Sequence, residues 1–209
     1  MTEKRPAETM VVTTEDIFRI LAHSVQSVLS SAINDAITFS PVVQTIEKTC
    51  LKPDIGCFVL LSGDFTGLVV LNFSEESAME IYRKYMARMG MPDSELSGSY
   101  TADEVSNSLG ELMNQCTGRF RVDLEKRTHI FVNQNQPKML VISEAVSVAI
   151  EASIDKPQLR RISFKTANGN RFYMEVALGE INFYSLFPFQ RAEEFNVDDI
   201  VVAGKKQKD

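Results

Sequence analysis

The fold is decided by one stretch of the chain, Gly56-Cys57-Phe58-Val59-Leu60-Leu61-Ser62-Gly63-Asp64-Phe65-Thr66-Gly67-Leu68-Val69-Val70-Leu71-Asn72-Phe73. Two apolar runs rich in β-branched and aromatic residues, 56–61 and 68–73, flank a short segment of Ser, Gly, Asp and Thr. This pattern predicts two neighbouring antiparallel strands joined by a turn. Because both runs are almost continuously apolar, we expect central strands that are covered on at least one face.

Three helices are expected around this hairpin. The first begins near Thr13 and the second near Ser74, each with a hydroxyl that can cap the helix and with carboxylates in the first turn. The third begins with a capping box at Thr101 and runs to about Lys126.

Further strands are expected before and after the helices. The segment 37–50 is β-like, and its Pro41 is typical of an edge strand or a bulge. After the third helix, strands are expected at 129–133, 139–142 and 145–154, and then a hairpin of 160–165 and 171–178 around Asn168-Gly169. The whole pattern predicts an α+β domain of two layers, in which long helices cover a mostly antiparallel sheet.

The length of 209 residues fits one domain, or one and a half. We expect a flexible N-terminal arm over residues 1–12, the α+β domain over 13–186, and a C-terminal extension over 187–209 that ends in a basic tail, Lys205-Lys206-Gln207-Lys208-Asp209.

Composition excludes several classes of function. The 22 Lys and Arg against 28 Asp and Glu give a net charge of −6, and the acidic balance argues against nucleic-acid binding. No apolar run approaches the roughly 20 residues that span a bilayer, so no membrane insertion is expected, and no secretion signal follows Met1. Three cysteines at spacings that match no disulfide scaffold indicate a reducing cytoplasm.

No cofactor of its own and no metal site are expected. The histidines, His23 and His129, have no metal-ligating partners at zinc spacing, and neither do Cys50 and Cys57. A role based on thiol chemistry ranks last, because Cys57 and Cys116 lie in apolar patterns where cysteine behaves as a small hydrophobe.

The third helix has an unusual polar face. Winding it at about 100° per residue gathers seven apolar side chains into one stripe, namely Val105, Leu109, Leu112, Met113, Cys116, Phe120 and Leu124. The opposite face carries Asn107, Glu111, Asn114 and Gly118, with Gly110 and Arg121 at its margin. Asparagine and glycine weaken a helix relative to alanine, so this face is inconsistent with a purely structural role. Such local inconsistency is typical of functional surfaces.

The sequence Gly110-Glu111-Leu112-Met113-Asn114 resembles the E-x-x-N signature of the CheC/CheX/FliY family of chemotaxis phosphatases. In that family a Ser or Asp usually precedes the Glu by four residues, and a Pro follows the Asn after 22 intervening residues. Here Pro137 lies at that distance from Asn114, and Asn107 occupies the Ser/Asp position. Residues 61–78 also resemble CheX, and the likeness covers roughly 14–180 with a single motif, as in CheX.

The resemblance implies a protein that stimulates hydrolysis of the aspartyl phosphate on a CheY-type response regulator. It implies that Asn114 orients the attacking water and that Glu111 pairs with a lysine of the receiver, which would also supply Mg²⁺. The partner-binding surface is then expected to comprise Asn107, Gly110, Gly118 and Arg121, with Pro137 as a structural element of the motif.

Two alternatives stay open. Asn107 carries no charge where the family has Ser or Asp, which favours a non-catalytic adaptor of the same fold that binds a receiver or a flagellar-switch component. The second alternative is a purely structural homo-oligomer built by extension of an unpaired sheet edge. A homodimer is expected, and dimerisation is compatible with phosphatase activity.

Overall fold

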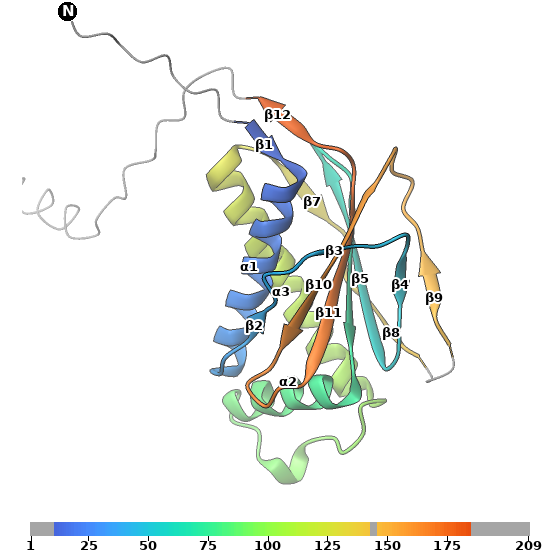
Figure 1. Ribbon diagram of the computed structural model, residues 1–209. Helices are drawn as coiled ribbons and strands as arrows, with labels where there is room; N and C mark the ends of the chain where they lie inside the picture. The colour runs from blue at the N-terminus through green and yellow to red at the C-terminus, as the bar shows by residue number, and fades with distance from the viewer. Residues whose placement is uncertain (1–10, 143–145, 185–209) are drawn as a thin grey trace, which may run out of the picture. The chain divides into compact units, whose positions relative to one another are not determined.

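The computed structural model of the chain describes residues 11–142 and 146–184 (Figure 1). Residues Val12–Asn182 form one compact unit. The C-terminal extension expected over 187–209 lies outside the described residues, as do residues 1–10 of the expected N-terminal arm. The last two residues of that arm, Val11 and Val12, belong to β1, which spans Val11–Thr13.

The helices are α1 (Thr14–Ile33), α2 (Glu75–Arg88) and α3 (Asp103–Thr128), with a short 3₁₀ helix, η1 (Asp93–Glu95), between α2 and α3. Thr13 caps α1 in a reciprocal capping box with Asp16, and Ser74 caps α2 through the Ser77 N–H. Within the part of the chain that is described, no helix has the length and apolar character needed to cross a membrane.

The capping box expected at Thr101 is wrong. The N-cap of α3 is Ala102, which has no side chain that can accept a hydrogen bond. The Thr101 hydroxyl lies 2.8 Å from the Ser99 hydroxyl, and the Thr101 N–H donates to the same Ser99 oxygen at 3.3 Å. A local turn therefore uses the hydrogen-bonding groups that the sequence pattern had assigned to the helix.

One sheet has the strand order β2-β10-β11-β6-β5-β7, in which β3 also pairs with β10 and β8 also pairs with β5. All of these pairings are antiparallel. The strands of the described chain, besides β1, are β2 (Thr38–Phe39), β3 (Gln44–Thr45), β4 (Thr49–Leu51), β5 (Ile55–Gly63), β6 (Gly67–Phe73), β7 (Val132–Gln134), β8 (Lys138–Val141), β9 (Val148–Ile150), β10 (Gln158–Lys165), β11 (Arg171–Leu178) and β12 (Asn182–Tyr184).

The hairpin predicted over residues 56–73 is confirmed as β5 and β6, paired from Ile55 opposite Phe73 to Leu61 opposite Gly67. The second predicted hairpin is confirmed as β10 and β11, with Gly169 in the left-handed region at φ +87°. Pro41 lies between β2 and β3, two short strands that both pair with β10. The strand expected at 129–133 begins instead at Val132, because α3 runs on to Thr128 and His129 is its left-handed C-cap.

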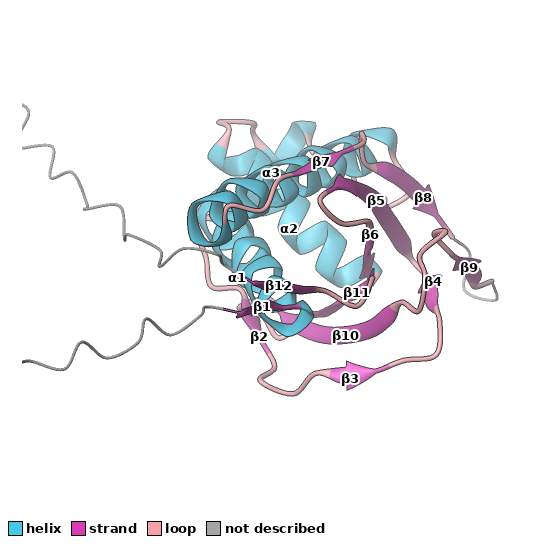
Figure 2. Cartoon of the chain, turned by 90° about the horizontal axis from the view of Figure 1, so that it is seen from above, coloured by secondary structure: helices cyan, strands magenta, loops and turns pink. Residues whose placement is uncertain are grey.

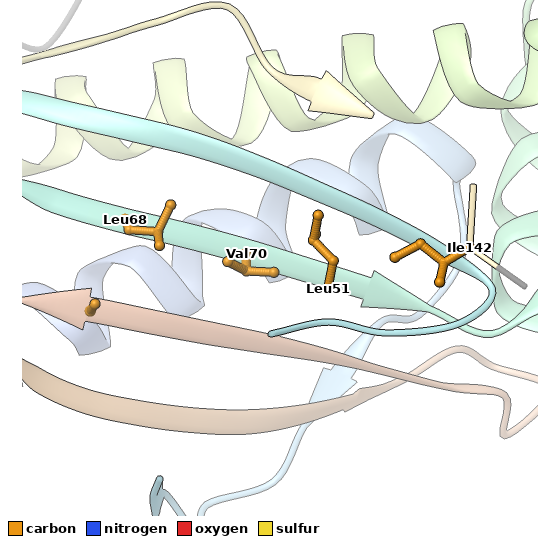
Figure 3. Packing of buried hydrophobic residues seen from close by; sticks show 5 residues of the cluster. Leu51, Leu68, Val70 and Ile142 are labelled. Atoms are coloured by element: carbon orange, nitrogen blue, oxygen red, sulfur yellow. The ribbon is translucent and has the colours of Figure 1, made fainter. Parts of the chain in front are cut away.

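The α+β prediction is confirmed, with the three helices packed on one side of a curved antiparallel sheet (Figure 2). One feature was not anticipated, namely that β4 and β9 pair with each other on the other side of the sheet (Figure 2). An apolar cluster that includes Leu51 of β4 packs here, made of Leu51, Leu68, Val70, Ile142 and Ala177. Figure 3 labels four of these side chains, which follow one another along β6 and its neighbours. The strand β6 is therefore buried along its whole length, whereas β5 is buried on both faces only at its start and exposes Leu60 near its end, so both strands are covered on at least one face as expected.

Two polar side chains on central strands hold β4 in place. The buried Glu175 accepts a hydrogen bond from the Cys50 N–H at 2.9 Å and forms an ion pair with Lys52 Nζ at 3.1 Å. Asn72 accepts from the Lys52 N–H at 2.8 Å and donates to the Cys50 carbonyl at 2.9 Å. Since a buried charge needs a partner and hydrogen bonds, these contacts fix where β4 can lie on the sheet.

Candidate functional site

The two faces of α3 separate as the helical winding predicts. All seven side chains of the predicted apolar stripe are buried, namely Val105, Leu109, Leu112, Met113, Cys116, Phe120 and Leu124. On the opposite face, Asn107, Glu111 and Asn114 are exposed to solvent. The stripe anchors α3 against the rest of the fold, and a rigid helix therefore presents the carboxylate and the amide.

An open pocket of about 200 Å³ lies over this polar face. Its lining from α3 is Ser106, Asn107, Gly110, Glu111 and Asn114, and its other wall is Gln136, Pro137 and Met139. The structure therefore brings Pro137, which is distant in sequence, to the E-x-x-N motif. Five of the seven residues proposed from the sequence line one pocket.

Gly110 explains how β8 can lie so close to α3. A Cβ built at Gly110 would be 3.3 Å from Met139 Cγ, which is tighter than most Cβ contacts, and 3.6 Å from Met139 Sδ, which is ordinary van der Waals contact. Glycine in the middle of a helix destabilises it, so its presence here fits the close approach of the Met139 side chain.

Gly118 and Arg121 lie outside the pocket lining. A Cβ at Gly118 would meet nothing within 4 Å, so the surface beside it is open. The Arg121 guanidinium is directed at its own chain, because Nε donates to the Val132 carbonyl at 2.7 Å and a terminal nitrogen donates to Asn133 Oδ1 at 3.4 Å. Arg121 thereby ties α3 to β7.

Two glutamines contact the motif and were not identified from the sequence. Gln115 Nε2 donates to Glu111 Oε1 at 3.2 Å, and Gln134 Nε2 donates to Asn114 Oδ1 at 2.7 Å. The first pair has the i, i+4 spacing of neighbours on a helix, which could have revealed it. The second joins α3 to β7, and no spacing rule links the two positions.

The charge of the pocket limits what it can bind. Among the described residues, its lining holds one carboxylate, that of Glu111, together with the amides of Asn107, Asn114 and Gln136, and no Lys or Arg. Such a lining does not compensate the charge of a free phosphate, so a phosphorylated ligand has to bring its own cations. The described residues also contain no group of three or more His, Cys, Asp or Glu side chains that could hold a metal ion.

Residues 8–209 match the model of a family described as a protein of unknown function, DUF3334. The chain belongs to the DUF3334 family. Among curated proteins, none matches this DUF3334 chain.

Solved structures of chemotaxis proteins share the fold of this DUF3334 chain. The chemotaxis protein CheX from Desulfovibrio desulfuricans has a TM-score of 0.63 at 18% identity, covering 78% of this chain and 99% of that one. A CheC-like superfamily protein from Shewanella sp. PV-4 has a TM-score of 0.63 at 20% identity, covering 78% and 97%. CheX in the CheX–CheY–BeF₃–Mg²⁺ complex from Borrelia burgdorferi has a TM-score of 0.60 at 15% identity, covering 79% and 99%. The resemblance drawn from the sequence is therefore confirmed at the level of the fold.

Proposed function

We propose that this protein stimulates hydrolysis of the aspartyl phosphate of a CheY-type response regulator. The observation that carries the proposal is the side-by-side exposure of Glu111 and Asn114 on a rigid helix, above a pocket that Pro137 helps to close. The fold shared with CheX, including the CheX that was crystallised with CheY, BeF₃ and Mg²⁺, supports the choice of partner.

The reaction needs little from the phosphatase. An acyl phosphate is reactive, and phosphoryl transfer depends on an aligned nucleophile and on compensated charge. A water oxygen attacks phosphorus, the bond between phosphorus and the aspartate oxygen breaks, and inorganic phosphate and the free carboxylate result. We assign to the Asn114 carboxamide the task of orienting that water in line with the breaking bond, which lowers the entropic barrier.

Glu111 supplies the docking contact in this proposal. It is the one carboxylate in the lining, and a receiver that presents a lysine beside its phosphoryl group offers the matching charge. The receiver also supplies Mg²⁺, so the phosphatase contributes no metal. Because Gly118 opens onto free space, a partner backbone can approach α3 one turn beyond Asn114.

The experiment compares two variants with two controls. Asn114→Ala is expected to abolish the stimulated decay of a phosphorylated receiver while leaving receiver affinity within about twofold, because it removes orientation rather than docking. Glu111→Lys is expected to weaken receiver binding by at least tenfold, because it places two like charges together.

The matched controls are Lys126→Ala and Glu125→Lys, exposed positions on the last turns of the same helix that lie outside the pocket. Both are expected to behave as the wild type. Unchanged turnover in Asn114→Ala contradicts the catalytic assignment, and unchanged affinity in Glu111→Lys contradicts the docking role.

A second function is favoured by one observation. Asn107 lines the pocket at the position where the related signature has Ser or Asp, so the anionic or hydroxyl group of that pattern is missing. A non-catalytic adaptor would bind the receiver through the same face without accelerating phosphate loss. Tight binding of a phosphorylated receiver together with an unaltered decay rate would select this function over the phosphatase.

A further inference from the structure

The Asn114 side chain is held by a residue from another element of the fold. Gln134 Nε2 donates to Asn114 Oδ1 at 2.7 Å. We infer that Gln134 is a positioning residue, which fixes the orientation of the Asn114 carboxamide in the pocket. This inference rests on the proposed function for its catalytic meaning, although the contact itself can be tested in the protein alone.

The backbone around Gln134 is fixed on both sides. Two residues before Gln134, the Val132 carbonyl accepts the 2.7 Å hydrogen bond from Arg121 on α3. The following Asn135 exchanges two hydrogen bonds with Leu60 of β5, from its N–H to the Leu60 carbonyl at 3.1 Å and from the Leu60 N–H to its Oδ1 at 2.9 Å. Gln134 therefore reaches Asn114 from a rigid strand, and Arg121 acts on the site through that strand.

The direction of the hydrogen bond decides which atoms of Asn114 face the pocket. The terminal torsion of an asparagine is broad, so a free carboxamide presents its oxygen or its nitrogen almost equally. A donor at Oδ1 removes this freedom and leaves the two N–H groups of Nδ2 available. Asn114 then offers hydrogen-bond donors to a water or a phosphoryl oxygen in the pocket.

Gln134 leaves one of its own groups unsatisfied. Its Oε1 is buried and accepts no hydrogen bond, one of two such side-chain atoms in the part of the chain that is described. A buried acceptor without a donor is costly, since its desolvation is not offset. A glutamine at this position therefore does not serve stability best, and what it provides is the hydrogen bond to Asn114.

The decisive variants have the same length as glutamine. Gln134→Met removes both hydrogen-bonding groups, and Gln134→Glu replaces the donor by an acceptor, so that Asn114 has to turn Nδ2 away from the pocket. Gln44→Met, an exposed position on β3, is the matched control. With a phosphorylated CheY-type receiver, both Gln134 variants are expected to lower kcat by about tenfold to a hundredfold, with KM within about twofold of the wild type.

Two readouts separate positioning from a structural role. Binding of the phosphorylated receiver to Gln134→Met is expected to stay within about twofold of the wild type, because Gln134 acts only through Asn114, which has no docking role in the proposed function. In the protein alone, the ¹⁵N-labelled side-chain amide of Asn114 is expected to become mobile on the nanosecond timescale in Gln134→Met and to stay ordered in Gln44→Met.

Each outcome decides one of the two ideas. If the wild type fails to accelerate receiver dephosphorylation, the proposed function fails, and the amide order of Asn114 alone decides whether Gln134 positions it. If the wild type is active, an unchanged kcat in both Gln134 variants overturns the inference. An Asn114 amide that stays ordered without Gln134 overturns it in either case.

Discussion

Replacing glycine by alanine at two positions of α3 tests how closely β8 approaches the helix. Gly110 and Gly118 lie on the same helix, and alanine is favoured over glycine inside a helix by about 0.8–1 kcal/mol. At Gly118 the new methyl group meets nothing within 4 Å, so Gly118→Ala is expected to gain the full amount. At Gly110 the methyl group would stand 3.3 Å from Met139 Cγ, so part of the gain is lost.

The size of that loss follows from the neighbour. Overpacking a core costs about 1–3 kcal/mol. Because a methionine side chain is flexible and can shift, we expect the cost here to be at the lower end of that range. Gly110→Ala is therefore expected to leave the free energy of unfolding within about 0.5 kcal/mol of the wild type. With a slope of about 2 kcal/mol per molar urea, Gly118→Ala raises the unfolding midpoint by about 0.5 M and Gly110→Ala by less than about 0.25 M.

Urea unfolding followed by far-UV circular dichroism measures both midpoints. Repeating the pair in a Met139→Ala background removes the contact, and there the two substitutions are expected to stabilise equally. If Gly110→Ala stabilises the otherwise unchanged protein as much as Gly118→Ala does, the packing of Met139 against Gly110 is refuted, and with it our account of that wall of the pocket.

Three further predictions concern thiols, acid stability and the pocket. Burial raises the pKa of Cys57 to about 12 and also raises the pKa of Cys116. Ellman's reagent at pH 8 is therefore expected to react with neither thiol until urea is added. Rapid reaction of these two thiols in the native protein would contradict their burial. Burial opposes the charge on Glu80, but hydrogen bonds led by that from Lys84 outweigh it and lower the pKa of Glu80. The contribution of the ionised Glu80 to stability is therefore complete above pH 4.5 and is lost as the pH falls through the lowered pKa. In Glu80→Gln, the midpoint of urea unfolding is expected to depend less on pH in that range. A pH dependence equal to that of the wild type would be the contrary result. Asn107→Ser is expected to raise the rate of receiver dephosphorylation with little change in affinity, and a rate that stays the same argues that the residue is only a contact.

Oligomeric state can be tested independently of activity. We propose a homodimer built on the sheet edge where β8 pairs only with β5 among the described strands, since Leu140 and Val141 of β8 are each about 40% exposed there. Sedimentation equilibrium is expected to give twice the mass of the 209-residue chain for the wild type and the mass of a single chain for Leu140→Lys. A wild-type monomer at every concentration would contradict the dimer.

The parts of the fold that the sequence predicted are those governed by short-range patterns. The apolar runs of β5 and β6 and the stripe of α3 repeat with the periods of a strand and a helix, so burial could be read from spacing alone. The pairing of β4 with β9 was hidden, because two three-residue strands almost a hundred residues apart carry no local signal. Asn72 and Glu175 interrupt apolar runs and could have indicated that something polar covers the sheet.

The candidate site divides in the same way. Glu111 and Asn114 are one helical turn apart, so their common face followed from helix geometry, whereas the arrival of Pro137 beside them was implied only by the family resemblance. Gln134 could not be predicted from the sequence, because its contact with Asn114 depends on how β7 pairs with β5. Arg121 was expected to face a partner, but its guanidinium donates instead to the carbonyl of Val132, the first residue of β7.

The most direct test of the proposed function is the decay of acyl phosphate on receiver domains from the organism that makes this protein. Each receiver is phosphorylated, freed of donor, and followed with and without a saturating amount of the full chain. At least one receiver is expected to lose phosphate at least tenfold faster with the wild type and at its intrinsic rate with Asn114→Ala. Equal decay of every receiver with and without the protein would contradict the proposed function.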